Sequence, residues 1–149
     1  MSDAAESERR LAERVVEAMT RRDGFSAWLG VEVVEIRPRA CTARLTVRRE
    51  MLNGFGVCHG GIAFSLADSA LAFASNTHGR VTVSIENSIT YPAPVREGDV
   101  LTAVAEQESA ANRLAFFRVP VTKQDGSIVA LFRGTVYKTS REFFPGEGE

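Results

Sequence analysis

A strongly apolar helix that carries a single charge is the feature that most constrains this chain. In the stretch HGGIAFSLADSALAFASN, residues 59–76, Asp68 is the only charged side chain between Gly60 and Thr77. Apolar residues lie on almost every side of this helix, so the rest of the protein must surround it. A carboxylate taken out of water costs several kcal/mol unless it is paired or protonated. The fold must therefore wrap around this helix and still accommodate Asp68.

The remaining sequence patterns predict how the helix is covered. Alternation of apolar and polar residues, with turn residues between the runs, is typical of strands in a sheet with one wet face. The expected elements are a helix over 6–24, strands over 31–37, 41–48, 81–91, 99–109, 113–123 and 128–138, and the central helix over 60–77. This order predicts an α+β domain whose mainly antiparallel sheet wraps around the central helix. We expect Gly24 to end the first helix, and Phe25, Trp28 and Leu29 to pack inside as an apolar plug.

Length, charge and cysteine content narrow the class of protein. A chain of 149 residues is long enough for one domain with its own core. We divide it into an N-terminal helix (1–24), a main domain (25–138) and a Gly/Pro/Glu-rich tail (139–149) expected to be flexible. A formal net charge of −1 provides no general basic field, so nucleic acid and membrane are not expected partners, and any anion site must be local. Cys41 and Cys58 show no metal-type spacing, and no leader or spanning segment is visible, so we expect a cytoplasmic protein with free thiols.

Asp68 has two interpretations that this helix alone leaves open. It can be a structural carboxylate paired with an arginine, or a catalytic carboxylate whose pKa the apolar surroundings raise. Gly60 and Gly61 bear on the choice, because backbone N–H groups at the start of a helix stabilise a developing anion. The oxyanion formed when a thioester or ester carbonyl is attacked is such an anion. A tight turn that merely needs glycine is the alternative.

The spacing of these residues predicts an oligomer if they serve one reaction. Gly60 and Asp68 are eight residues apart, which is about 12 Å along a helix. A reacting carbonyl needs the oxyanion donor and the attacking group within roughly 3 Å each. One helix cannot supply both, whereas two antiparallel helices beside a two-fold axis can. The site would then be composite, with Gly60 of one chain meeting Asp68 of the other.

Three stretches resemble a known family. They are NGFGVCHGGIAFSLADSALAFASN (residues 53–76), ITYPAP (89–94) and IVALFRGT (128–135). Together they are similar to the PaaI-type hotdog-fold acyl-CoA thioesterases, and the likeness covers residues 25–138. The resemblance implies a sheet wrapped around a long helix, a homotetramer built from two dimers, and hydrolysis of acyl-CoA thioesters. It also implies aryl substrates, such as phenylacetyl-CoA or its ring-hydroxylated forms, and no metal or cofactor beyond the CoA of the substrate.

The resemblance assigns catalytic roles to four positions. Asp68 matches the family's acidic residue, which acts as a nucleophile or as the base for a water. Gly60 matches the oxyanion-hole donor, and Asn53 matches the asparagine that orients the acid or the water from across the interface. His59 either bonds the thioester carbonyl or braces the loop, and we favour bracing.

Further positions are expected to contact the substrate. Gly61 accompanies Gly60, and Ser84 corresponds to a serine that helps to hold the attacking water in some relatives. Tyr91, Asn112 and Arg113 fall where relatives contact CoA. Some related thioesterases have a threonine four residues after the acid; this chain has Ala72 there. The downstream basic candidates for the CoA phosphates are Arg96, Arg113, Arg118 and Lys123.

Other activities fit the sequence less well. Adjacent residues such as Cys58 and His59 rarely form a nucleophile and base pair. The two histidines and scattered acids predict no metal site, and the helix lacks the turn of a serine hydrolase. A non-catalytic acyl-CoA-binding module and an acyl-CoA hydratase on the same scaffold stay as alternatives. Acyl-CoA turnover that Asp68→Asn abolishes would separate the thioesterase from both.

Overall fold

The computed structural model describes residues 2–147. Its helices are α1 (Asp3–Thr20), α2 (Gly24–Leu29) and α3 (Gly60–Asn76), with a single 3-10 turn, η1, at Arg49–Met51. Its strands are β1 (Glu32–Arg37), β2 (Ala40–Thr46), β3 (Arg80–Thr90), β4 (Val100–Ala111), β5 (Leu114–Thr122) and β6 (Ile128–Glu142). The element order is the predicted one, apart from the short α2 and the 3-10 turn.

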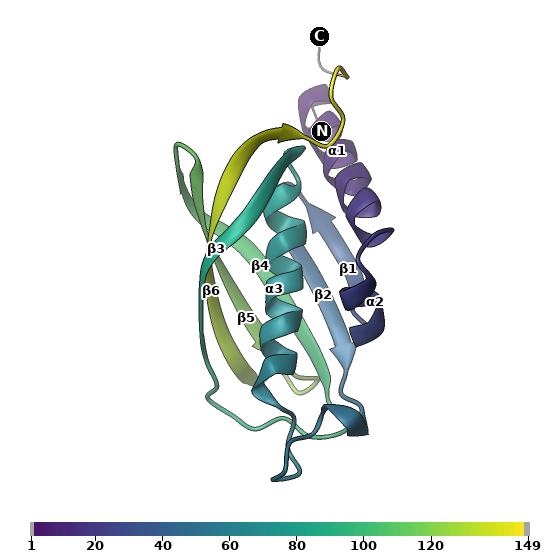
Figure 1. Ribbon diagram of the computed structural model, residues 1–149, viewed down its shortest axis with the longest axis vertical. Coiled ribbons are helices and arrows are strands. Elements are labelled where there is room, and N and C mark those ends of the chain that lie inside the picture. Colours follow the sequence, from purple (N-terminus) through teal and green to yellow (C-terminus); the bar gives the residue numbers. More distant parts are fainter. Residues whose placement is uncertain (1, 148–149) are drawn as a thin grey trace.

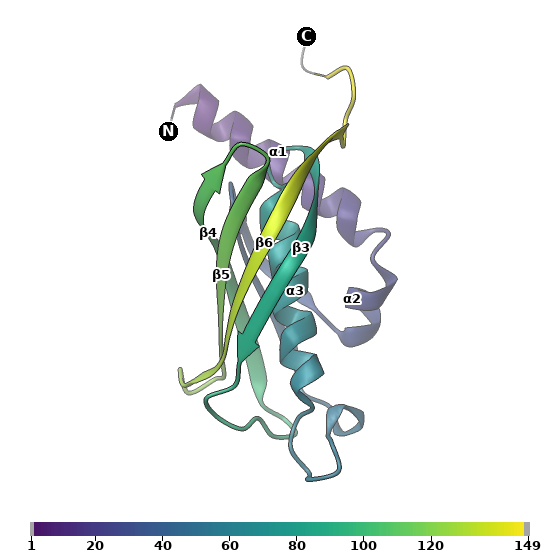
Figure 2. The same cartoon turned by 60° about the vertical axis from the view of Figure 1, so that its left-hand side comes forward.

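One six-stranded antiparallel sheet wraps around α3. The strand order is β1-β2-β4-β5-β6-β3, so β1 and β3 form its two edges. The sheet curves behind and beside the helix, while α1 and α2 pack on the β1 side (Figure 1). β3 lies beside β6, with which it pairs (Figure 2), and no other strand of residues 2–147 pairs with it. The α+β architecture with a sheet around a central helix is confirmed.

The faces of α3 explain why the sheet has to curve. Leu66, Ala67, Ala70, Leu71 and Ala74 have no solvent exposure. They occupy the sides of the helix that the sheet covers, and the small alanines let the strands come close. At the far end, the buried Asn76 side chain exchanges hydrogen bonds with the backbone of Thr82 at 2.8 and 3.0 Å. These bonds fix the end of α3 to the beginning of β3.

Gly134 is the closest point between the sheet and α3. A Cβ built at this position would lie 2.4 Å from Leu71 Cδ2 and 2.8 Å from Asn87 Oδ1. Leu71 is fully buried in the core, so it has no free space into which to retreat. Only glycine therefore allows α3 and β3 to approach this part of β6.

The segment between the two helical regions differs from our prediction. Gly24 does not end the first helix, which stops at Thr20; it begins α2, where the Asp23 side chain caps Ser26 N–H at 2.9 Å. Leu29 is buried as predicted, but Phe25 and Trp28 are 53% and 69% exposed. Because Ser26 and Leu29 lie on the inner face of this short helix, Phe25 and Trp28, each one position earlier, point outward. Their expected place in the core is wrong.

The predicted flexible tail is partly structured. β6 continues to Glu142, so residues 139–142 belong to the sheet. Beyond it, Phe143 N–H donates to the Gly79 carbonyl at 2.8 Å. Arg14 on α1 stacks over the Phe144 ring at 4.3 Å and pairs with Glu147 at 2.6 Å. Residues 148–149 of the predicted tail lie outside the described residues. No helix in residues 2–147 combines the length and apolarity needed to cross a membrane.

We predict that Gly134→Ala destabilises the fold. The added methyl group would overlap Leu71 in a packed core, so the free energy of unfolding should fall by about 1 to 3 kcal/mol. Chemical denaturation of the purified variant measures this change. Gly24→Ala is the matched control, because nothing lies within 4 Å of its Cβ position, and its stability should equal or slightly exceed that of the wild type. Equal stability of the two variants would contradict the close approach at Gly134.

Candidate active site

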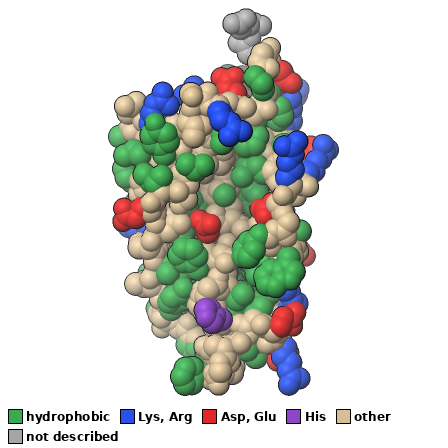
Figure 3. Space-filling view, in the orientation of Figure 1, with side chains coloured by type: hydrophobic (Ala, Val, Ile, Leu, Met, Phe, Trp, Pro, Cys, Tyr) green, Lys and Arg blue, Asp and Glu red, His purple; other side chains and the backbone are tan. Residues whose placement is uncertain are grey.

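Asp68 lies half-buried on the side of α3 that the sheet leaves uncovered. None of the ion pairs among residues 2–147 includes it, so it is not a structural partner of any arginine in this part of the chain. Its Oδ1 accepts a hydrogen bond from Asn87 Nδ2 at 3.1 Å. Burial raises the pKa of Asp68, and the bond from Asn87 offsets part of that rise. Figure 3, in the orientation of Figure 1, shows hydrophobic side chains exposed on both sides of the middle of this face, where α3 runs in the ribbon view.

Asn87 receives its own orientation from Ser84. The Ser84 hydroxyl donates to Asn87 Oδ1 at 2.8 Å, which leaves the Asn87 amide N–H to bond Asp68. Three residues apart on a regular strand, these side chains would face opposite sides. The register of β3 shifts between Ser84 and Glu86, and this bulge brings both side chains to the helix-facing side. The structure thus adds Asn87, which sequence reasoning missed, between Ser84 and the acid.

The start of α3 leaves one backbone N–H without a partner. His59 is the N-cap residue, and its Nδ1 accepts from Gly61 N–H at 2.9 Å. Ile62 N–H is bonded to the His59 carbonyl at 3.0 Å. Among residues 2–147 the Gly60 N–H has no hydrogen-bond acceptor. Because the His59 Nδ1 accepts a bond, its neutral ring carries the proton on Nε2, which is a free donor near the same helix start.

Two aromatic rings pack so closely on Gly60 and Gly61 that a side chain at either position would contact them tightly. Tyr91 donates its hydroxyl proton to the Gly60 carbonyl at 2.9 Å, and a Cβ at Gly60 would lie 3.0 Å from the phenol ring. A Cβ at Gly61 would lie 3.0 Å from Nδ1 of His59. The phenol and the imidazole therefore pack directly on the backbone at the helix start. Neither glycine has a positive φ, so close packing rather than backbone strain selects it.

Asn53 shapes the loop that leads to α3. Its Oδ1 accepts from the N–H groups of Phe55 and Val57 at 2.9 and 3.4 Å, as in an Asx turn. The loop closes through an antiparallel bridge between Leu52 and Cys58, and Phe55 at its tip is 92% exposed. Within this chain Asn53 does not bond Asp68. Its side-chain Nδ2 has no partner among residues 2–147.

The predicted CoA-contact residues do not form one group within a chain. Tyr91 lies at the start of α3, beside Gly60. Asn112 and Arg113 form the turn between β4 and β5, where Asn112 has a φ of 52°. They line a pocket together with His78 and Gly79, which follow the other end of α3. Arg113 is therefore a turn residue rather than the first residue of a strand, and it lies far from Gly60.

Cys58 has the wrong ionisation for a nucleophile. Burial, helped by the charge of Asp99, raises the pKa of its thiol to about 11. The thiol is thus protonated at neutral pH, whereas attack requires the thiolate. The acid available at this site is Asp68.

Residues 55–130 match the thioesterase superfamily, and relatives found by sequence agree. The chain is 34% identical to the acyl-coenzyme A thioesterase PaaI of Escherichia coli over 121 residues, which cover 81% of this chain and 86% of that protein. It is 38% identical over 135 residues to a putative esterase of Archaeoglobus fulgidus, covering 91% and 88% of the two chains.

Comparison with solved structures also finds thioesterases. The structure of E. coli PaaI, a protein of the phenylacetic acid degradation operon, matches with a TM-score of 0.87 and 32% identity over 89% of this chain and 96% of that one. A hypothetical thioesterase of Streptococcus pneumoniae with coenzyme A matches with a TM-score of 0.72 and 26% identity, over 76% and 91%. The fold, the sequence match and these relatives define a hotdog-fold thioesterase. The chain belongs to the thioesterase superfamily, in its PaaI-like branch, and is a thioester hydrolase; the predicted resemblance is confirmed.

We predict that Asp68→Asn stabilises the folded protein at neutral pH. A carboxyl group whose pKa is raised on folding binds more protons in the folded than in the unfolded chain, so it lowers stability as pH rises through that interval. Asparagine removes the charge. Its advantage in denaturation midpoint should be largest at pH 7 and shrink below the ordinary carboxyl pKa of about 4. If the Asp68→Asn variant were less stable than wild type at pH 7, burial of the charged Asp68 carboxylate would not be destabilising, and the prediction would be wrong.

Proposed function

We propose that this enzyme hydrolyses acyl-CoA thioesters, with aryl-acyl groups such as phenylacetyl as its substrates, and that Asp68 and Gly60 from different chains form its active site. The observation that carries the proposal concerns α3: within residues 2–147, the backbone N–H at its start has no acceptor, and the carboxylate on its uncovered side has no ion pair. The first suits an oxyanion, and the second suits a base or a nucleophile.

The chemistry follows from the charge that each group handles. The thioester carbonyl oxygen accepts the Gly60 N–H, which stabilises the negative charge that develops when the carbon is attacked. Asp68 in its ionised form either takes a proton from water, so that hydroxide adds to the carbon, or attacks the carbon itself. In the first route the tetrahedral intermediate expels the CoA thiolate and leaves the carboxylic acid. In the second route expulsion of the thiolate leaves an acyl-aspartyl anhydride, which water then cleaves.

Neighbouring groups support these roles. The Ser84–Asn87 pair directs an amide N–H at Asp68 Oδ1, which keeps the other carboxylate oxygen available for water or substrate. His59 braces the helix start through Gly61, and this bond leaves the Gly60 N–H as the free donor. Asn53 keeps its Nδ2 free within its own chain, and we assign it to the acid or the water of a partner chain.

The distance along α3 requires a second chain. Gly60 and Asp68 lie about 12 Å apart along one helix, which exceeds what one carbonyl group can bridge. No strand of residues 2–147 pairs with the outer edge of β3, where Val83 and Ile85 are 46% and 58% exposed. A long edge strand of this kind is a template for pairing with another chain. We propose a dimer in which two copies of α3 run antiparallel, and the pairing of two such dimers gives the tetramer.

Support for the acyl-CoA and aryl substrates comes from the relatives. One is an acyl-CoA thioesterase by name, one structure contains coenzyme A, and another comes from a phenylacetic acid degradation operon. The exposed Phe25 and Trp28 rings, 6.0 Å apart on α2, lie on a helix that is tied to α3 by the Ser26–Ser69 hydrogen bond at 2.9 Å. An apolar acyl group needs apolar surfaces of this kind beside the catalytic helix.

We predict that removing the Gly60 N–H slows phenylacetyl-CoA hydrolysis. Gly60→Pro deletes this N–H at the first helical position, where proline is tolerated, and His59 already has the extended backbone that precedes proline. The turnover number should fall about 100- to 1000-fold. Gly60→Ala meets the same Tyr91 ring but keeps the N–H, so it is the matched control and should retain much more activity. Thiol release measures both; equal activity would contradict the oxyanion role.

We further predict that two inactive variants complement each other. Asp68→Asn should lose activity about 100-fold or more. When it is unfolded and refolded together with an equal amount of Gly60→Pro, half of the dimers contain one of each chain. Each mixed dimer then has one intact site, so about one quarter of the wild-type activity should return. Activity no higher than that of the separate variants would show that each site lies within one chain.

A further inference from the structure

The side-chain amide of Asn87 is held from three sides. Its Nδ2 donates to Asp68 Oδ1 at 3.1 Å, and its Oδ1 accepts from the Ser84 hydroxyl at 2.8 Å. On the third side lies Gly134 of β6, where an added Cβ would be 2.8 Å from Asn87 Oδ1. A hydrogen bond at each end and the strand beside it therefore confine the amide.

The orientation of this amide matches an ionised Asp68. A carboxylate only accepts hydrogen bonds, whereas an amide has one donating and one accepting end. If the Asn87 amide were turned over, its carbonyl oxygen would face the carboxylate, and two acceptors would meet. The bond from the Ser84 hydroxyl to Asn87 Oδ1 supports the observed orientation. Asp68 Oδ1 is thus held by a donor, whereas Oδ2 has no hydrogen-bond donor within residues 2–147.

Charged side chains of the sheet do not act on Asp68. The causes of its raised pKa within residues 2–147 are burial and, in the opposite direction, the bond from Asn87. The charged residues on the neighbouring parts of β3, β4 and β6 point away from α3, because strand residues alternate between the two faces of a sheet. They are Glu86, Glu108 and Arg133, which line a hollow on the outer face.

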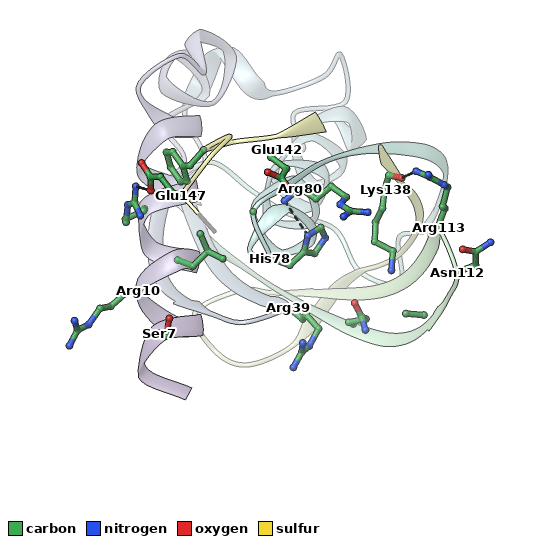
Figure 4. Close-up of a pocket in the computed structure, with 16 residues that line it drawn as sticks. Ser7, Arg10, Arg39, His78, Arg80, Asn112, Arg113, Lys138, Glu142 and Glu147 are labelled. Atoms are coloured by element: carbon green, nitrogen blue, oxygen red, sulfur yellow. Dashed lines mark hydrogen bonds and ion pairs between the residues drawn. The ribbon is translucent and has the colours of Figure 1, made fainter. Parts of the chain in front are cut away.

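The charges of the other neighbouring elements are also directed elsewhere. On α2 the Asp23 carboxylate accepts from the backbone and the hydroxyl of Ser26. The cations drawn around His78 in Figure 4 lie beyond the end of α3. His78 is ten residues after Asp68, which is about 15 Å along a helix. Within the described chain, the amide of Asn87 is therefore the polar group that acts on the acid.

We propose that Asn87 is a positioning residue of the active site, which holds Asp68 Oδ1 and makes Oδ2 the reacting oxygen, and that Ser84 acts on the acid through Asn87. This inference rests on the proposed function and deepens it, because it names the reacting atom and the residues that orient it. The resemblance to thioesterases implies that a serine at this place holds the attacking water. In this chain the single proton of the Ser84 hydroxyl is bonded to Asn87 instead.

Replacing the amide with a carboxyl group tests the orientation. Asn87→Asp keeps the size but replaces the donor with an acceptor, so two carboxyl groups share the site and the second proton leaves only at higher pH. The acid limb of the kcat/KM profile for phenylacetyl-CoA should move up by about one pH unit or more. The NMR titration of the Asp68 carboxyl carbon, a signal identified by its absence from Asp68→Asn, should move with it.

Ser88→Asp is the matched control. It adds the same charge one residue further along β3, opposite Arg133 on the outer face of the sheet, so both readings should stay as in wild type. Equal shifts in the two variants would overturn the proposal. So would phenylacetyl-CoA hydrolysis with an unmoved profile in Asn87→Asp, a result that leaves the proposed function intact. If the carbon signal moves as expected but no acyl-CoA is cleaved, the proposed function is refuted and the orientation of Asp68 by Asn87 is supported.

A second set of variants tests whether Ser84 acts through Asn87. Asn87→Leu removes the donor at similar size, and the misaligned acid should lower kcat about tenfold or more while KM stays within about twofold of wild type. Ser84→Ala should lower kcat in the wild-type chain and have no further effect in the Asn87→Leu chain. An equal loss in both chains would show that Ser84 acts on the water directly, and would overturn its proposed action through Asn87.

Discussion

The close approach of α3 to β6 at Gly134 is the constraint on which the rest of the structure depends. The space that a Cβ would occupy there is filled by Leu71 from the helix and by the Asn87 amide from β3. Leu71 anchors the helix in the core, and Asn87 bonds Asp68. The absence of one methyl group therefore sets both the depth of the helix in the sheet and the position of the amide that faces the acid.

This arrangement explains how the helix tolerates its single charge. Asp68 forms no ion pair within residues 2–147 and is not fully buried; it receives one hydrogen bond and remains at the uncovered side of α3. Its pKa is raised because partial burial disfavours the charged form more than the single hydrogen bond from Asn87 favours it. A carboxylate held in this way is less favourable for folding than a neutral side chain, but it is more basic, which is the property that attack on a carbonyl group requires.

The sequence predicted the fold because the apolar helix and the alternating strands are strong local patterns. The spacing of Asp68 and Gly60 on one helix, where geometry is regular, also made them candidate site residues, and the family resemblance added His59. Asn87 escaped prediction because the bulge in β3 changes which residues face the helix, and bulges have no simple sequence signature. Phe25 and Trp28 were misplaced because a helix of six residues is too short to show a period. The pocket that Asn112 and Arg113 line with His78 escaped prediction because its basic side chains come from five segments that only the tertiary fold brings together, and of the four predicted basic candidates it contains only Arg113.

The proposed pairing relates the two ends of α3. If Gly60 of each chain meets Asp68 of the other, the two-fold axis must pass midway between these positions, beside Phe64. The first halves of the two helices then lie together, and their second halves point away from each other. Each site then takes its oxyanion donor from the start of one helix and its attacking group from the middle of the other. The division of labour between the chains therefore separates oxyanion binding from attack, and a single chain, whose Gly60 and Asp68 lie about 12 Å apart along the helix, can carry out only one of the two tasks on a given thioester.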